Sequence, residues 1–163
     1  MARVLLVDTL KNRSDLPFSV RASSLLDGGE GAFVADMAKQ LNLAEIGDDT
    51  DERIGVAEII ARAGRAKEAE TLLRGALAKD RFNERAYQVL LALYMPGAPL
   101  QDDSKLSDLS RQLRETIPSS RVIRWLAAAE LAQRQLWPQV EAALISLSEE
   151  APPDPGMIEL LVS

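Results

Sequence analysis

The chain has 163 residues, of which 47% are hydrophobic, and this is enough for a domain with a buried core. Its formal net charge of −6 argues against a nucleic-acid backbone as its partner. Cysteine and histidine are both absent, which excludes disulfides and thiolate sites and removes the commonest general base and zinc ligand. We therefore expect no metal ion and no other cofactor.

Hydropathy predicts neither a membrane span nor a signal peptide. No apolar run approaches the roughly 20 residues that a spanning helix needs. The run VLLV at 4–7 is too short for the core of a signal peptide, and no small-residue cleavage site follows it. We expect a soluble protein and favour the cytoplasm as its location.

The first fifty residues predict a helical N-terminal segment. Residues 1–13 fit a strand or a helix, and we prefer the helix because a lone strand finds no partner in a helical protein. Residues 14–43 predict a helix pair interrupted at Gly28 and Gly29. We interpret 1–49 as a helical cap or as a degenerate repeat. The apolar positions behind the helix pair are Phe18, Ala22, Leu25, Phe33, Met37 and Leu41.

The stretch from Ile54 to Asn83 predicts two amphipathic helices folded back on each other. Apolar residues recur at steps of three and four, so each set lies on one helical face. Gly64 stands between the sets, where a helix can end in a left-handed turn. The acidic residues at 48–52 offer helix caps and favourable charge for the first helix, and we prefer this role to a calcium site. Asp102 and Asp103 are interpreted in the same way.

The hairpin pattern recurs twice further along the chain. Ala57 corresponds to Leu91 at an offset of 34, and Ala69 to Leu106 at an offset of 37. The first and third units differ by 71 residues throughout, so that Ala57 pairs with Ala128 and Ala69 with Val140. The three-residue difference falls in MPGAPLQDD at 95–103, whose proline and glycine content predicts a loop.

The period and anchor residues resemble the tetratricopeptide repeat family, whose consensus runs W-x2-L-G-x2-Y, A-x3-F and P over about 34 residues. The resemblance covers 50–154, with repeats at 50–83, 84–120 and 121–154. It departs from the family at Leu91 and Leu106, where small residues are usual, and at Arg53 and Arg124, where an aromatic is usual. The anchors that carry it are Val56, Ala57, Ile60, Gly64, Ala69, Leu73 and Ala76; then Tyr87, Leu90, Leu91, Tyr94, Leu106, Leu113 and Pro118; then Ala127, Ala128, Leu131, Trp137, Val140, Leu144, Leu147 and Pro152.

The resemblance implies an all-α protein, an α-solenoid of antiparallel helix pairs. Residues 155–163 would then begin a further helix, with Ile158, Leu161 and Val162 at apolar positions. Such an end is usually covered. We interpret it as a chain truncated from a longer protein, in preference to a helix that docks on a partner or on a second copy.

Motifs for catalysis are missing from the sequence. It contains no P-loop, no G-x-G-x-x-G and no G-x-S-x-G. The glycines of DGGEGAF at 27–33 lack the preceding strand and the Lys-Ser/Thr of a phosphate site, so we interpret them as a helix end. We therefore predict that the chain is not an enzyme.

In tetratricopeptide-like folds the first helices of successive repeats line a concave groove that holds a peptide. Trp125 is the natural anchor there, with packing inside the solenoid as the alternative. Arg62 and Arg85 could bind a carboxylate, although pairing with Glu58 and nearby acids is preferred. The family's Lys and Asn clamp for chaperone tails is missing. The groove residues that the resemblance implies are Ile54, Glu58, Arg62, Arg85, Gln88, Met95, Trp125 and Gln133.

The function we expect is that of an adaptor or scaffold that binds a protein or peptide on its concave face. One alternative is a regulatory or substrate-docking domain of a larger enzyme or of a secretion or assembly machine. Another is a scaffold that forms homo-oligomers through the ends of its solenoid. In each case the expected partner is protein, with no nucleic acid.

Overall fold

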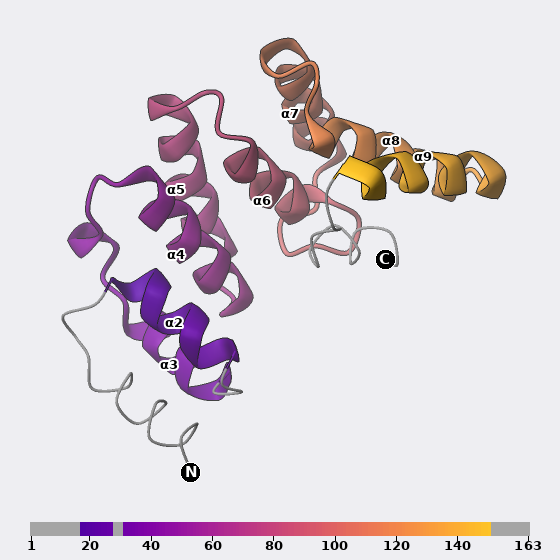
Figure 1. Cartoon of the computed structure of the whole chain (residues 1–163). Helices are drawn as coiled ribbons and strands as arrows, with labels where there is room; N and C mark the ends of the chain where they lie inside the picture. The colour runs from indigo at the N-terminus through magenta and orange to yellow at the C-terminus, as the bar shows by residue number, and fades with distance from the viewer. Residues whose placement is uncertain (1–16, 28–30, 151–163) are drawn as a thin grey trace. The chain divides into compact units, whose positions relative to one another are not determined.

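A computed structural model describes residues 17–27 and 31–150 of the chain. Within these ranges the backbone forms eight α-helices and one short 3₁₀ helix, and no strand (Figure 1). The prediction of an all-α protein is thereby confirmed. The expectations for residues 1–13 and 155–163 lie outside the described residues. The helices are α2 (Phe18–Asp27), α3 (Gly31–Gln40), η1 (Leu43–Glu45), α4 (Thr50–Arg62), α5 (Ala66–Lys79), α6 (Glu84–Tyr94), α7 (Asp103–Thr116), α8 (Arg121–Gln133) and α9 (Trp137–Glu150).

The chain divides into two compact units, Met1–Leu93 and Tyr94–Ser163. In unit 1, α4 packs against α5, and α2 and α3 pack on each other and on α4. In unit 2, α8 packs against α9, and α7 also contacts α8. Packing is therefore pairwise between helices that follow each other in the sequence. The helix pair predicted within 14–43 is present as α2 and α3.

The α4–α5 hairpin is the best-buried part of unit 1. α4 begins where the Asp49 carboxylate accepts a hydrogen bond from the backbone N–H of Glu52 at 2.7 Å, as the acidic cluster predicted. Ala57 of α4 and Ala69 of α5 are fully buried. Small side chains allow the two helices to approach closely, so the hairpin buries its apolar faces against each other.

The turn of this hairpin has the conformation that its glycine predicts. Gly64 has a φ of +86°, in the left-handed region where a Cβ would be strained. The backbone N–H of Arg65 donates to the carbonyl of Ile60 at 2.9 Å, and that of Gly64 donates to the carbonyl of Ala61 at 3.1 Å. These bonds satisfy carbonyl groups that the end of α4 would otherwise leave unpaired.

A close contact joins α2 to α4. A Cβ at Gly55 would lie 2.8 Å from the Cβ of Ser19, so this crossing requires glycine. The backbone N–H of Ser19 donates to the carboxylate of Glu52 at 3.2 Å, and its hydroxyl donates to the same carboxylate. The small pair at the crossing and the polar contacts beside it hold α2 against α4.

Arg65 fastens α3 to the hairpin. It stands at the start of α5, and its Nη1 donates to the carbonyls of Ala38 and Leu41 at the end of α3. The same guanidinium donates to Glu68 through Nε at 2.7 Å and through Nη2 at 2.6 Å. The hydrogen bond from Arg65 lowers the pKa of the Glu68 carboxyl, and the same bond raises the pKa of Arg65.

Asp48 connects the two ends of the α4–α5 hairpin. Its carboxylate accepts from Arg53 near the start of α4 and from Lys79 at the end of α5, each at 2.8 Å. Lys79, by hydrogen bond and by charge, and the charge of Arg53 lower the pKa of the Asp48 carboxyl. The acidic cluster therefore caps and ties helices, as expected.

The α8–α9 hairpin of unit 2 has the same turn as α4–α5, displaced by 71 residues. Leu136 donates to the carbonyl of Leu131 at 3.1 Å, and Gln135 donates to that of Ala132 at 2.9 Å. The residue in the left-handed conformation is Gln135, with a φ of +59°, where the first hairpin has Gly64. A non-glycine residue here was not predicted.

The segment between α6 and α7 forms the loop that its composition predicted. Gly97 has a φ of +81°. The Asp102 carboxylate then accepts from the backbone N–H groups of Ser104 and Lys105, each at 3.0 Å, and so caps α7. The capping role expected for Asp102 is confirmed.

Candidate partner-binding surface

The predicted groove residues are distributed over both units. Ile54, Glu58 and Arg62 lie on α4, and Arg85 and Gln88 lie on α6, all within unit 1. Met95, Trp125 and Gln133 belong to unit 2. Each set is described within its own unit.

Glu58 and Arg85 join α4 to α6. The guanidinium of Arg85 donates to the two carboxylate oxygens of Glu58, from Nε at 2.9 Å and from Nη2 at 2.8 Å. The Arg85 side chain is 54% exposed and that of Glu58 is 31% exposed. Such an exposed pair contributes little to stability, but its two-pronged geometry fixes the direction of both side chains. The preference for intramolecular pairing of Arg85 is confirmed.

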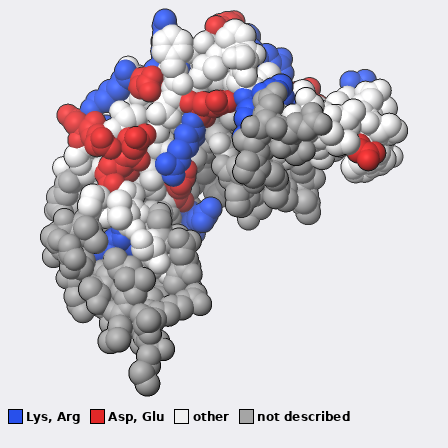
Figure 2. All heavy atoms as spheres, viewed as in Figure 1, with Lys and Arg blue, Asp and Glu red and all other residues white. Residues whose placement is uncertain are grey.

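Arg62 is an exposed cation one helical turn beyond Glu58. No ion pair in the described part of the chain involves its guanidinium. Figure 2 shows basic and acidic side chains alternating over the face of α4 and α6. We call this surface, formed by Glu58, Arg62, Arg85, Gln88 and Ala92, the α4–α6 face. Along α6 it continues from exposed Arg85 through half-buried Gln88 to exposed Ala92.

Ile54 belongs to the core, because its side chain is completely buried. α4 is covered by α2, by α3 and by α5, and the α2 crossing at Gly55 is adjacent to Ile54. Neighbours on three sides leave only a narrow exposed stripe on α4, which begins at Glu58 rather than at Ile54.

In unit 2, Trp125 contributes to the interior. It is 5% exposed, and within the described residues its indole nitrogen has no hydrogen-bond partner. This agrees with the alternative of packing inside the protein. Met95 lies half-buried in the turn after α6. Gln133 ends α8, and its side chain is outside the described residues.

Sequence reasoning missed the large apolar side chains that are exposed. These are Val20 at 51%, Phe82 at 57%, Trp137 at 62% and Ile145 at 51%. The guanidinium of Arg81 lies 4.7 Å from the centre of the Phe82 ring. Trp137 and Ile145 both belong to α9, and their equivalents in the other hairpins are the signal that could have revealed them.

The described residues contain no cluster of three or more side chains suited to hold a metal ion. Over the same residues, no helix combines the length and the apolar character needed to span a bilayer. The carboxyl groups with lowered pKa values, Asp48 and Glu68, lie beside cations that tie helices together. What these arrangements can do is hold elements in place and present polar groups to a partner.

Comparison of the chain with protein-family models, with curated proteins and with solved structures finds no significant match. The resemblance to tetratricopeptide repeats thus remains a prediction from the residues that carry it.

Proposed function

We propose that this chain is a non-catalytic interaction module that binds a peptide or protein segment through the α4–α6 face of unit 1. One observation carries the proposal. Arg62 is exposed and has no ion-pair partner in the described residues, and it lies one turn from a Glu58–Arg85 pair whose geometry is fixed.

We further propose that the helix pairs are tandem units of a tetratricopeptide-like solenoid. The support is the turn shared by the α4–α5 and α8–α9 hairpins. Two left-handed residues, Gly64 and Gln135, and the same hydrogen bonds recur at an offset of 71 residues. An offset of 71 is that of two repeats with one three-residue loop insertion.

The chemistry of the face favours a partner segment that carries a carboxylate. Arg62 offers a planar set of donors for a carboxylate, and the Glu58–Arg85 pair next to it restricts the approach to one side. Gln88 can pair with a peptide group, and the small side chain of Ala92 permits close approach. An extended segment with one acidic residue matches this sequence of groups.

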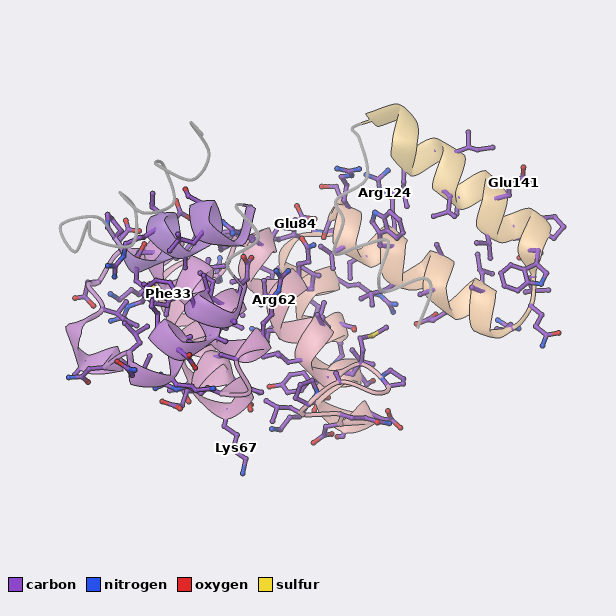
Figure 3. The ribbon with its side chains drawn as sticks, turned by 90° about the horizontal axis from the view of Figure 1, so that it is seen from below. Phe33, Arg62, Lys67, Glu84, Arg124 and Glu141 are labelled. Atoms are coloured by element: carbon purple, nitrogen blue, oxygen red, sulfur yellow. The ribbon has the colours of Figure 1, made fainter. Side chains whose placement is uncertain are left out.

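The test compares two exposed cations of unit 1. Arg62 and Lys67 are both exposed and stand on different helices, and Lys67 extends away from unit 1 on a side remote from Arg62 (Figure 3). Proteins from the native host are captured on the wild-type chain, on Arg62→Ala and on Lys67→Ala, and are quantified by mass spectrometry. We expect partners whose retention falls about tenfold with Arg62→Ala and is unchanged with Lys67→Ala.

Circular dichroism of both variants establishes that the helices are intact. If no captured protein distinguishes Arg62→Ala from the wild type while both are folded, the α4–α6 face is not the binding surface.

A further inference from the structure

The outward side of α9 is an apolar surface. Trp137 is 62% exposed and Ile145 is 51% exposed, and Pro138 and Ala142 are exposed with them. The opposite side of the helix is buried against unit 2 through Val140 and Leu147. The exposed positions recur at steps of four and three, so they form one face, which we call the α9 face.

The second helices of the other hairpins are polar at the same positions of the register. Ile145 of α9 corresponds to Arg74 of α5 and to Arg111 of α7, at offsets of 71 and 34. Arg74 pairs with Glu70 at 3.1 Å, and Arg111 pairs with Asp108 at 2.5 Å, so both helices carry solvated ion pairs there.

The neighbouring positions differ in the same direction. Ala142 corresponds to Thr71 in α5 and to Asp108 in α7, and Pro138 corresponds to Lys67 and Ser104. Two helices of the chain therefore show what the solvated version of this face looks like, and α9 departs from it at several positions. Contiguous exposed apolar side chains of this kind mark interaction sites.

One charge lies inside the α9 face and defines the partner. Glu141 is exposed one turn after Trp137 and one turn before Ile145, so it stands between them. Two copies of α9 packed antiparallel through this face would bring their Glu141 carboxylates together, in a protein that already carries a net charge of −6. Self-association is therefore disfavoured, and a cation flanked by apolar residues is the complement.

We propose that the α9 face docks a basic amphipathic helix of a partner protein. Apolar side chains of that helix contact Trp137 and Ile145, and a Lys or Arg between them pairs with Glu141. The surface belongs to unit 2, whereas the α4–α6 face belongs to unit 1, so this inference stands without the function proposed above.

The experiment uses the full-length chain and a synthetic amphipathic helix of leucine and lysine, about 14 residues long. The same peptide with glutamate for lysine is the charge control. Binding is followed through the indole N–H signals of the two tryptophans by NMR, assigned with Trp137→Phe. We expect the Trp137 signal to shift with the lysine peptide and to remain in place with the glutamate peptide.

Two variants with the same change in charge give the specificity. Glu141→Lys should weaken binding of the lysine peptide about tenfold. Asp108→Lys, on the solvated face of α7, should leave it within about twofold. Equal effects of the two variants, or no shift of the Trp137 signal, would overturn the proposal.

The same measurement distinguishes other occupants of the face. Concentration-dependent shifts of the Trp137 signal in the chain alone would identify a second copy as the occupant. A Trp137 signal lost on adding neutral phospholipid vesicles, and not restored by the lysine peptide, would identify a membrane surface. Either result would overturn the proposal in favour of that occupant.

Discussion

The α4–α5 and α8–α9 hairpins share one backbone turn and differ in nearly everything around it. The first has glycine in the left-handed position and a polar outer side; the second has Gln135 there and an apolar outer side. The hydrogen bonds that close the turn are the same in both. Backbone satisfaction at the helix end thus determines the turn, while the surrounding residues are left to stability and to binding.

The largest expected effect tests the seam of the first hairpin. Ala69→Asp places a carboxylate where no side chain is exposed, and we expect the free energy of unfolding to fall by about 4 kcal/mol. Urea unfolding followed by circular dichroism measures it. Lys67→Asp, on the exposed side of α5, is the control and should change stability by less than about 0.5 kcal/mol. A wild-type midpoint for Ala69→Asp would show that this seam is misplaced.

A smaller effect is expected where α2 crosses α4. The methyl group of Gly55→Ala would meet the Cβ of Ser19 at 2.8 Å, which we expect to cost about 1–2 kcal/mol after the gain in helix propensity. Ser19→Gly removes the obstructing atom. The double variant should therefore lose less stability than the two single losses add up to, and strict additivity would contradict the close crossing.

The two left-handed residues predict opposite changes. Gly64→Ala should destabilise by about 1 kcal/mol because a Cβ is strained at a φ of +86°. Gln135→Gly relieves that strain in the second hairpin and should stabilise by up to about 1 kcal/mol. Thermal melts of the two variants measure both. A destabilised Gln135→Gly would mean that the second turn is closed in some other way.

The smallest effect is a dependence on pH confined to unit 1. The folded protein holds the pKa of Glu68 and of Asp48 below their usual values, so both carboxylates favour folding at neutral pH. That contribution is lost as the pH falls through the lowered pKa values, below about pH 4. Glu68→Gln should flatten this part of the stability profile, measured by urea unfolding between neutral and acidic pH. An unchanged slope would show that the Arg65–Glu68 pair does not form in solution.

Much of the local structure follows from the sequence. Apolar spacing predicts the helix pairs, including α2 and α3, because buried faces at a period of 3.6 residues leave a direct trace in the residues. Asp49, Asp102 and Gly64 were predicted from the needs of helix ends. Gln135 was not, because its backbone is determined by bonds from neighbouring residues and not by its own side chain.

The candidate surface could be predicted only in part. Glu58, Arg62 and Arg85 are exposed as expected, because they are charged residues on the outer stripe of their helices. Ile54 is buried because α2 and α3 also pack on α4, which depends on tertiary contacts between distant segments. The exposed Trp137 was missed because its size and apolar character alone indicate burial.

The link from Arg65 to α3 implies an order of assembly. The carbonyls of Ala38 and Leu41 obtain their donor only after the chain has advanced to the start of α5. We therefore expect α4 and α5 to associate early, through neighbouring segments, and α3 to be secured late. Arg65→Met should then accelerate the unfolding rate and leave the refolding rate nearly as it is, a signature that stopped-flow kinetics would reveal.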